Sequence, residues 1–128
     1  MSQLSALCSR LNVRAAATYG TTKPVPEDFT NANPWTVTLF YGARRLTVPF
    51  FTGSAISSEP TAADVLHCLI SDSTSVDNAR DFQDWAGDFG YDVDSRKAHS
   101  IYKACQSISK RLHKFLGDDF EMFASAEH

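Results

Sequence analysis

Hydrophobic and polar residues alternate along residues 35–41, which is the period of a β-strand with one buried face. After a turn that begins at Gly42, residues 45–51 alternate in the same way. Pro49 has no amide proton to donate to a neighbouring strand, so the second strand is expected at an edge of its sheet. The two segments predict an antiparallel β-hairpin, which needs helices on its apolar face to be stable.

Helical spacing of apolar residues begins after Thr61. Asp64 follows Thr61 by three residues, which is the arrangement of a capping box with aspartate in place of glutamate. The polar residues 71–73 are expected to end this first helix. A second helix is expected from residue 77 or 78 to Phe89, with Phe89 on its apolar side.

The third helix is the longest. It is expected to begin near Ser95, to run for about six turns and to end before Gly117. Residues 118–123 are long enough for one more short turn of helix. At the other end of the chain, residues 4–13 have a short amphipathic pattern, and residues 18–34 are rich in the residue types of loops.

Together these segments predict an α+β fold in which a two-stranded antiparallel β-hairpin packs against three α-helices, with an irregular N-terminal arm. Residues 1–34 are expected to hold the short N-terminal helix and the arm, and residues 35–128 to form a compact domain. A chain of 128 residues has room for one domain that buries about two-thirds of its unfolded surface.

The net charge of −3 conceals two opposed blocks. Between residues 59 and 94 there are nine carboxylates and one basic side chain, whereas residues 95–117 contain six Lys or Arg and no acid. Within the acidic block, four aspartates recur at helical steps of four, three and four residues, which would place them on one face of a helix. We expect this face and the two aspartates that follow it to bind a partner: Asp77, Asp81, Asp84, Asp88, Asp92 and Asp94.

Each charged block has more than one interpretation. An acidic helix can imitate the phosphates of a nucleic acid and compete for a basic groove, or it can be an ordinary solvated face. The basic third helix can bind nucleic acid, attract the acidic helix within the fold, or support end-to-end self-association. Its candidate contacts, with two arginines of the hairpin turn, are Arg44, Arg45, Lys103, Lys110, Arg111 and Lys114.

Catalytic and metal-binding motifs are incomplete. Residues 88–90 match the metal-binding triplet of protein kinases without the other kinase motifs, and residues 92–95 begin like a calcium loop without its glycine and closing glutamate. A nucleophilic pair of Cys68 or Cys105 with His99 is conceivable, but both thiols fall on apolar helix faces. We therefore expect no enzyme, no metal and no cofactor.

Membrane and secretion signals are also missing from the pattern. No apolar run approaches the ~20 residues that span a bilayer, and the first residues lack the charged and apolar regions of a signal peptide. The three cysteines, Cys8, Cys68 and Cys105, are odd in number and widely spaced, which indicates reduced thiols. A cytoplasmic protein is the expectation.

Several blocks of sequence resemble a family of small bacteriophage and prophage accessory proteins. They are residues 35–39, 46–53, 60–66, 82–85, 90–92, 94–98, Tyr102 and residues 115–118. The resemblance implies a protein made inside a host bacterial cell, compatible with an anti-CRISPR inhibitor, and it assigns no functional residue.

The expected function is therefore non-catalytic. The acidic face would block a basic nucleic-acid-binding surface of a host CRISPR-Cas effector, with Trp35, Phe40 or Phe51 as apolar anchors. Direct contact with nucleic acid is not expected in this interpretation. The alternative is a phage regulatory protein that binds nucleic acid through the basic third helix. The oligomeric state is left open.

Overall fold

The computed structural model describes residues 2–19, 35–49 and 61–128. Within these ranges, three strands form an antiparallel sheet in the order β1-β2-β3, and a 3-10 turn joins the last two of five α-helices. The fold is α+β, as predicted. The elements are α1 (Gln3–Arg10), β1 (Arg14–Tyr19), β2 (Trp35–Tyr41), β3 (Arg44–Pro49), α2 (Ala62–Asp77), α3 (Phe82–Asp88), α4 (Arg96–Leu116), η1 (Gly117–Asp119) and α5 (Phe120–Ser125).

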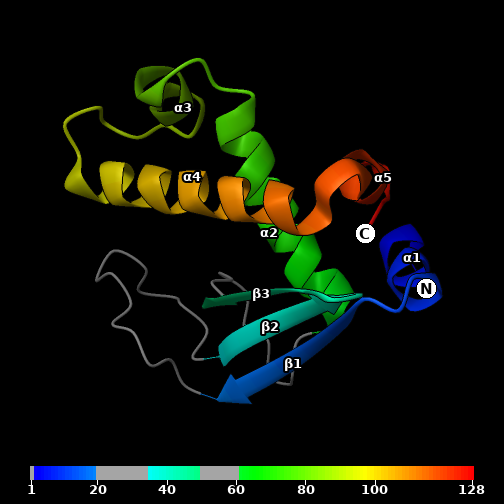
Figure 1. Cartoon of the computed structure of the whole chain (residues 1–128). Helices are drawn as coiled ribbons and strands as arrows, with labels where there is room; N and C mark the ends of the chain where they lie inside the picture. The colour runs from blue at the N-terminus through cyan, green and yellow to red at the C-terminus, as the bar shows by residue number, and fades with distance from the viewer. Residues whose placement is uncertain (1, 20–34, 50–60) are drawn as a thin grey trace.

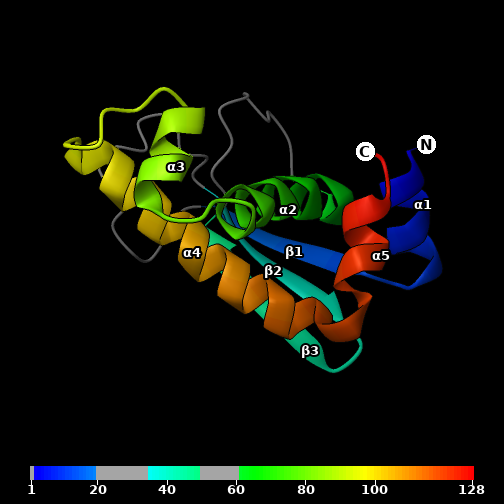
Figure 2. The same cartoon turned by 90° about the horizontal axis from the view of Figure 1, so that it is seen from above.

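Helices α2 and α4 cross each other on one face of the sheet (Figures 1 and 2). α2 contacts β1, α4 contacts β3, and the two helices pack extensively against each other. α1 and α5 lie together at one end of the molecule, where the Leu4 amide donates to the Glu127 carbonyl at 2.8 Å. α3 lies at the opposite end, beside the first turns of α4 (Figure 1).

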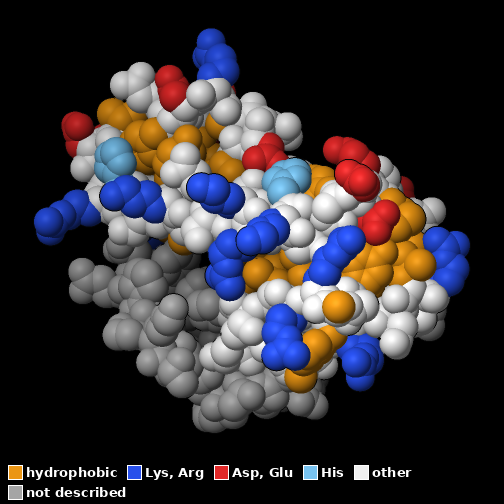
Figure 3. Space-filling view, in the orientation of Figure 1, with side chains coloured by type: hydrophobic (Ala, Val, Ile, Leu, Met, Phe, Trp, Pro, Cys, Tyr) orange, Lys and Arg blue, Asp and Glu red, His pale blue; other side chains and the backbone are white. Residues whose placement is uncertain are grey.

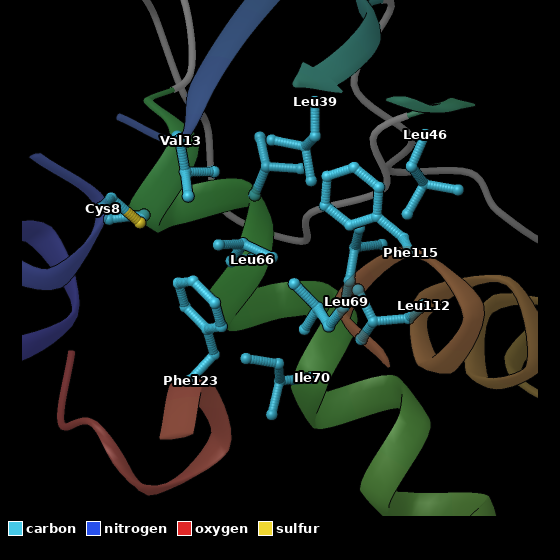
Figure 4. Close-up of a cluster of buried hydrophobic side chains, with 14 of the residues drawn as sticks. Cys8, Val13, Leu39, Leu46, Leu66, Leu69, Ile70, Leu112, Phe115 and Phe123 are labelled. Atoms are coloured by element: carbon cyan, nitrogen blue, oxygen red, sulfur yellow. The ribbon is translucent and has the colours of Figure 1, made fainter. Parts of the chain in front are cut away.

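The main hydrophobic core fills the space between the sheet and the helices (Figure 4). Leu39 and Leu46 enter it from the sheet, Leu66 from α2, Phe115 from α4 and Phe123 from α5, and all five are buried. Each side chain of this kind contributes about 1.5–3 kcal/mol when it leaves water. The alternation along β2 and β3 thus places its apolar members in the core, as predicted.

The hairpin is one part of a larger sheet. β2 and β3 pair with Leu39 opposite Leu46, and Gly42 adopts a φ of +62° in the turn between them. β1 pairs with the other side of β2, which places β3 at an edge, as Pro49 predicts. The prediction of two strands was wrong.

The missing strand is β1, which falls within the segment expected to be an irregular arm. Its run of alanines at residues 15–17 has no alternation of its own, so its strand conformation comes from pairing with β2. Residues 20–34 of the expected arm lie outside the described residues. So do residues 50 and 51 of the expected second strand.

α2 begins with the predicted capping box. The Thr61 hydroxyl accepts from the Asp64 amide at 3.1 Å, and the Asp64 carboxylate accepts from the Thr61 amide at 3.4 Å. The helix was expected to end at residues 71–73, and that prediction was wrong, because α2 continues to Asp77. Ser73 lies inside this helix and is buried, and its hydroxyl forms hydrogen bonds with Asp77 on α2 and Ser109 on α4.

Capping residues mark the ends of the remaining helices. α3 begins at Phe82, later than expected, because Asp81 is its N-cap. α4 matches its prediction closely, with Ser95 as N-cap and Gly117 at a φ of +57° at its end. The expected short turn after α4 is η1 followed by α5.

Candidate partner-binding surface

Asp77 is the last residue of α2 and contacts α4. Its Oδ2 lies 2.6 Å from Nε2 of His113, and its Oδ1 accepts a hydrogen bond from the Ser109 hydroxyl at 2.7 Å. Burial raises the pKa of Asp77, but the hydrogen bonds from His113 and Ser109 outweigh it, so the pKa lies below its ordinary value. Asp77 therefore holds α2 against α4. The expectation that it shares one helical face with Asp81 was wrong.

Asp81 and Asp84 stabilise the start of α3. The Asp81 carboxylate accepts from the Asp84 amide at 2.9 Å, as an N-cap does. The Asp84 carboxylate accepts from the Arg80 amide at 3.1 Å and lies 3.5 Å from the Arg80 guanidinium. The hydrogen bond from the Arg80 amide, aided by the nearby charge, lowers the pKa of Asp84. Both carboxylates therefore have local structural roles.

Asp88, Asp92 and Asp94 are exposed, at the end of α3 and in the connection to α4. The Asp92 carboxylate accepts from the Asp94 amide at 3.0 Å, which tightens this connection. Between residues 81 and 94 the sequence contains no Lys or Arg. In the described part of the chain, no ion pair joins these three carboxylates to a cation. Among the described residues, these three carboxylates therefore have no direct ionic partner.

A second, smaller core lies beside these carboxylates, between α3 and α4. Trp85 is 2% exposed, and its Nε1 donates to the Ser75 hydroxyl at 3.2 Å. Tyr91 and Tyr102 lie against the Trp85 ring, with centroid distances of 5.6 and 5.3 Å. These contacts fix α3 and the connection that follows it onto the first half of α4.

Phe89 and Val93 project from this end of the molecule, with 56% and 42% of their surface exposed. Phe89 was expected on the buried side of the second helix, and that prediction was wrong. It follows the last residue of α3, where Gly90 reverses the chain at a φ of +72°. Gly90 is the sequence signal that places Phe89 beyond the helix. Figure 3 shows hydrophobic side chains at the α3 end of the molecule, with both acidic and basic side chains at their margin.

The basic residues of α4 do not neutralise the acidic block. In the described residues, no aspartate forms an ion pair with a Lys or Arg of α4. The ion pairs that the described aspartates do form join Asp84 to Arg80, Asp77 to His113 and Asp64 to His128. Among the described residues, the direct charged contact between the two blocks is that of Asp77 with His113.

Asp77, His113 and Ser109 resemble a catalytic triad in composition only. In a triad the serine bonds to the histidine, whereas the Ser109 hydroxyl donates to Asp77 and is buried. Neither thiol that was considered for a nucleophilic pair bonds to His99 in the described part of the chain. The His99 ring stacks on Phe82 at 3.9 Å.

The thiols lie in surroundings that keep them protonated. Burial, with a contribution from Asp72, raises the pKa of Cys105 to about 12 and that of Cys68 to about 11. A thiol is a nucleophile only as the thiolate, so these raised pKa values disfavour a nucleophilic role at neutral pH. Within the described ranges, no three His, Cys, Asp or Glu side chains are grouped so as to hold a metal ion. None of the described helices has the length and hydrophobicity to cross a bilayer.

Trp35 and Phe51, two of the predicted apolar anchors, cannot be placed, because the Trp35 side chain and residue 51 lie outside what the structure describes. The third, Phe40, is half-buried between Arg14 and Arg45. No protein-family model, curated protein or solved structure matches the chain. Its function must therefore be inferred from its own residues.

Proposed function

We propose that the chain acts by binding another protein through its α3 end, and that it is a phage anti-defence protein of the anti-CRISPR type. The observation that carries this proposal is the exposure of Phe89 and Val93 among Asp88, Asp92 and Asp94. We call these five residues the acidic end.

The chemistry of the acidic end suggests the kind of partner. Aromatic and aliphatic side chains that enter a pocket supply most of the affinity of an interface, while surrounding charges steer the encounter and exclude wrong partners. In the described residues these carboxylates form no ion pair, so they are available to a basic surface. A groove that binds nucleic acid is basic by necessity, because it must neutralise phosphates.

The second core supports binding without a large rearrangement. Trp85 and Tyr91 hold the connection that carries Phe89 and Val93 against α4. A preorganised surface loses less conformational entropy on binding than a mobile one. The phage setting and the CRISPR-Cas effector as target come from the resemblance of the sequence blocks.

The test is a plaquing assay in bacteria that carry CRISPR systems of different types and express the chain. A phage targeted by each system should regain plaquing in at least one strain. The double variant Phe89→Ser with Val93→Ser should lose this effect. Met122→Ser, which alters an exposed hydrophobic residue of α5 (38% exposed), is the matched control and should retain it.

Two outcomes contradict the proposal. One is unchanged interference in every CRISPR type when the wild-type chain is expressed. The other is full inhibition by the double variant, provided that its thermal melt shows a folded protein.

A further inference from the structure

A pocket of about 420 Å³ lies between β3 and the last turns of α4. Four of the residues that line it are cationic, namely Arg44, Arg45, Arg111 and Lys114, and none of its lining residues carries a carboxylate. Phe115 and Leu46 form part of its apolar wall. In the described part of the chain, no acidic side chain forms an ion pair with any of the four cations.

Two of the arginines are held in place by backbone carbonyls. Nη1 of Arg44 donates to the carbonyls of Phe115 and Leu116 at 3.1 and 3.2 Å, and Arg111 donates to the carbonyl of Thr47. A guanidinium has five N–H donors, so each arginine retains donors for an anion. The structure thus gathers positive charge in a concave site and orients it.

The positive charge continues along α4 beyond the pocket. Lys103, Lys110 and Lys114 are separated by seven and four residues, so they lie on one face of the helix. All three are exposed, and they span about 16 Å at a rise of 1.5 Å per residue. Figure 3 shows a row of Lys and Arg side chains that follows α4 across this face of the molecule. A single small anion would occupy the pocket alone, whereas a polyanion would contact the whole row.

We propose that the pocket and three lysines of α4, Lys103, Lys110 and Lys114, together bind the phosphate groups of a nucleic-acid strand. Each strand of a duplex advances 3.4 Å along the axis per phosphate, so a row of about 16 Å is long enough to reach more than one phosphate. This surface is separate from the acidic end, and it departs from the expectation of no direct contact with nucleic acid. Attraction of the basic helix to the acidic block within the fold was one alternative for its charge, and in the described residues no ion pair joins a Lys or Arg of α4 to that block.

The test measures fluorescence anisotropy of labelled 20-nucleotide single-stranded and double-stranded DNA with the full chain, over a series of salt concentrations. Binding should occur at low salt and weaken steeply as salt rises, because counterions are released. The variant Arg45→Gln, Lys110→Gln, Lys114→Gln spares the arginines that bond to backbone carbonyls, and it should bind at least tenfold more weakly. The control variant Arg10→Gln, Arg80→Gln, Lys97→Gln removes the same charge elsewhere and should bind within twofold of wild type.

Three results would overturn the proposal. The first is no binding of either DNA at low salt. The second is equal loss of affinity in the two triple variants, which would show an effect of net charge alone. The third is binding of pyrophosphate, measured by calorimetry, as tightly as DNA, which would indicate a site for a small phosphate. Because the Phe89→Ser, Val93→Ser variant leaves the basic surface intact, it should bind DNA as wild type does.

Discussion

The Asp77 carboxylate lies 2.6 Å from Nε2 of His113 and joins the end of α2 to α4. Asp77→Asn should lower the free energy of unfolding by about 1 kcal/mol, since hydrogen bonds to a charged group are strong but this one is partly exposed to solvent. Asp88→Asn, at an exposed position, should leave it unchanged. Urea unfolding of both variants at pH 7 makes the comparison.

The same contact predicts that the free energy of unfolding depends on pH in the acid range. Because the folded protein holds the pKa of Asp77 below its ordinary 3.8, the stabilisation is complete above that value and is lost as the pH falls through the lowered pKa. The difference between wild type and Asp77→Asn should therefore shrink below pH 3.8. Equal stability of the Asp77 and Asp88 variants at pH 7 would show that the contact contributes nothing.

Asp72 gives stability the opposite dependence on pH. Burial raises its pKa to about 6, so its charged form is disfavoured in the folded protein. Stability should fall as the pH rises from about 4 to about 6, and remain lower above that range. Asp72→Asn should stabilise the protein at pH 8 by on the order of 2 kcal/mol and have little effect at pH 4. Thermal melts at the two pH values decide, and an equal effect at both would contradict the prediction.

Trp85 anchors the second core, so its loss should be costly. Trp85→Ala should lower the free energy of unfolding by about 3–5 kcal/mol. Trp85→Phe keeps a ring but loses the hydrogen bond to Ser75, and should cost about 1 kcal/mol beyond the reduced packing. Phe89→Ala, at a side chain that is 56% exposed, should cost less than ~0.5 kcal/mol. A similar loss from the two alanine variants in urea unfolding would mean that Trp85 is not packed as described.

The Tyr41 hydroxyl donates to Oδ2 of Asp119 at 2.7 Å and joins β2 to η1. This hydrogen bond is the main reason that the pKa of Tyr41 is raised above 10.0. Its contribution is present below pH 10.0 and is lost as the pH rises through the raised pKa. Tyr41→Phe should cost about 1 kcal/mol at pH 8. In denaturant unfolding at pH 11.5 or above, the gap between Tyr41→Phe and wild type should narrow, and a constant gap would argue against the contact.

The features of the fold that arise from nearby residues were predictable. The Thr61 and Asp64 capping box, the Gly117 helix end and the pairing of residues 35–41 with the next strand were all expected. The features that depend on distant residues were not. β1 is a strand because it pairs with β2. Ser73 is accommodated inside α2 because its hydroxyl donates to the Ser109 hydroxyl on α4.

The same distinction applies to the acidic end. Its charge is visible in the sequence, since no cation lies between residues 81 and 94. That Asp77 does not belong to it is not visible, because Asp77 contacts His113, which is distant in the sequence and adjacent in the fold. The exposure of Phe89 depends on Gly90, whose role as a helix end competed with the helical spacing of the aromatic residues.

The central claim is that the acidic end binds the partner, and charge removal tests it most directly. Asp88→Asn, Asp92→Asn and Asp94→Asn keep the shape and remove three charges, whereas Asp118→Asn, Glu121→Gln and Glu127→Gln remove as many near the other end of the molecule (Figure 1). The measurement is the plaquing efficiency of a targeted phage in the strain whose CRISPR system the wild-type chain inhibits. We predict that the first variant melts like wild type and loses at least tenfold in plaquing efficiency, while the second retains it. Full inhibition by the folded first variant would contradict the account.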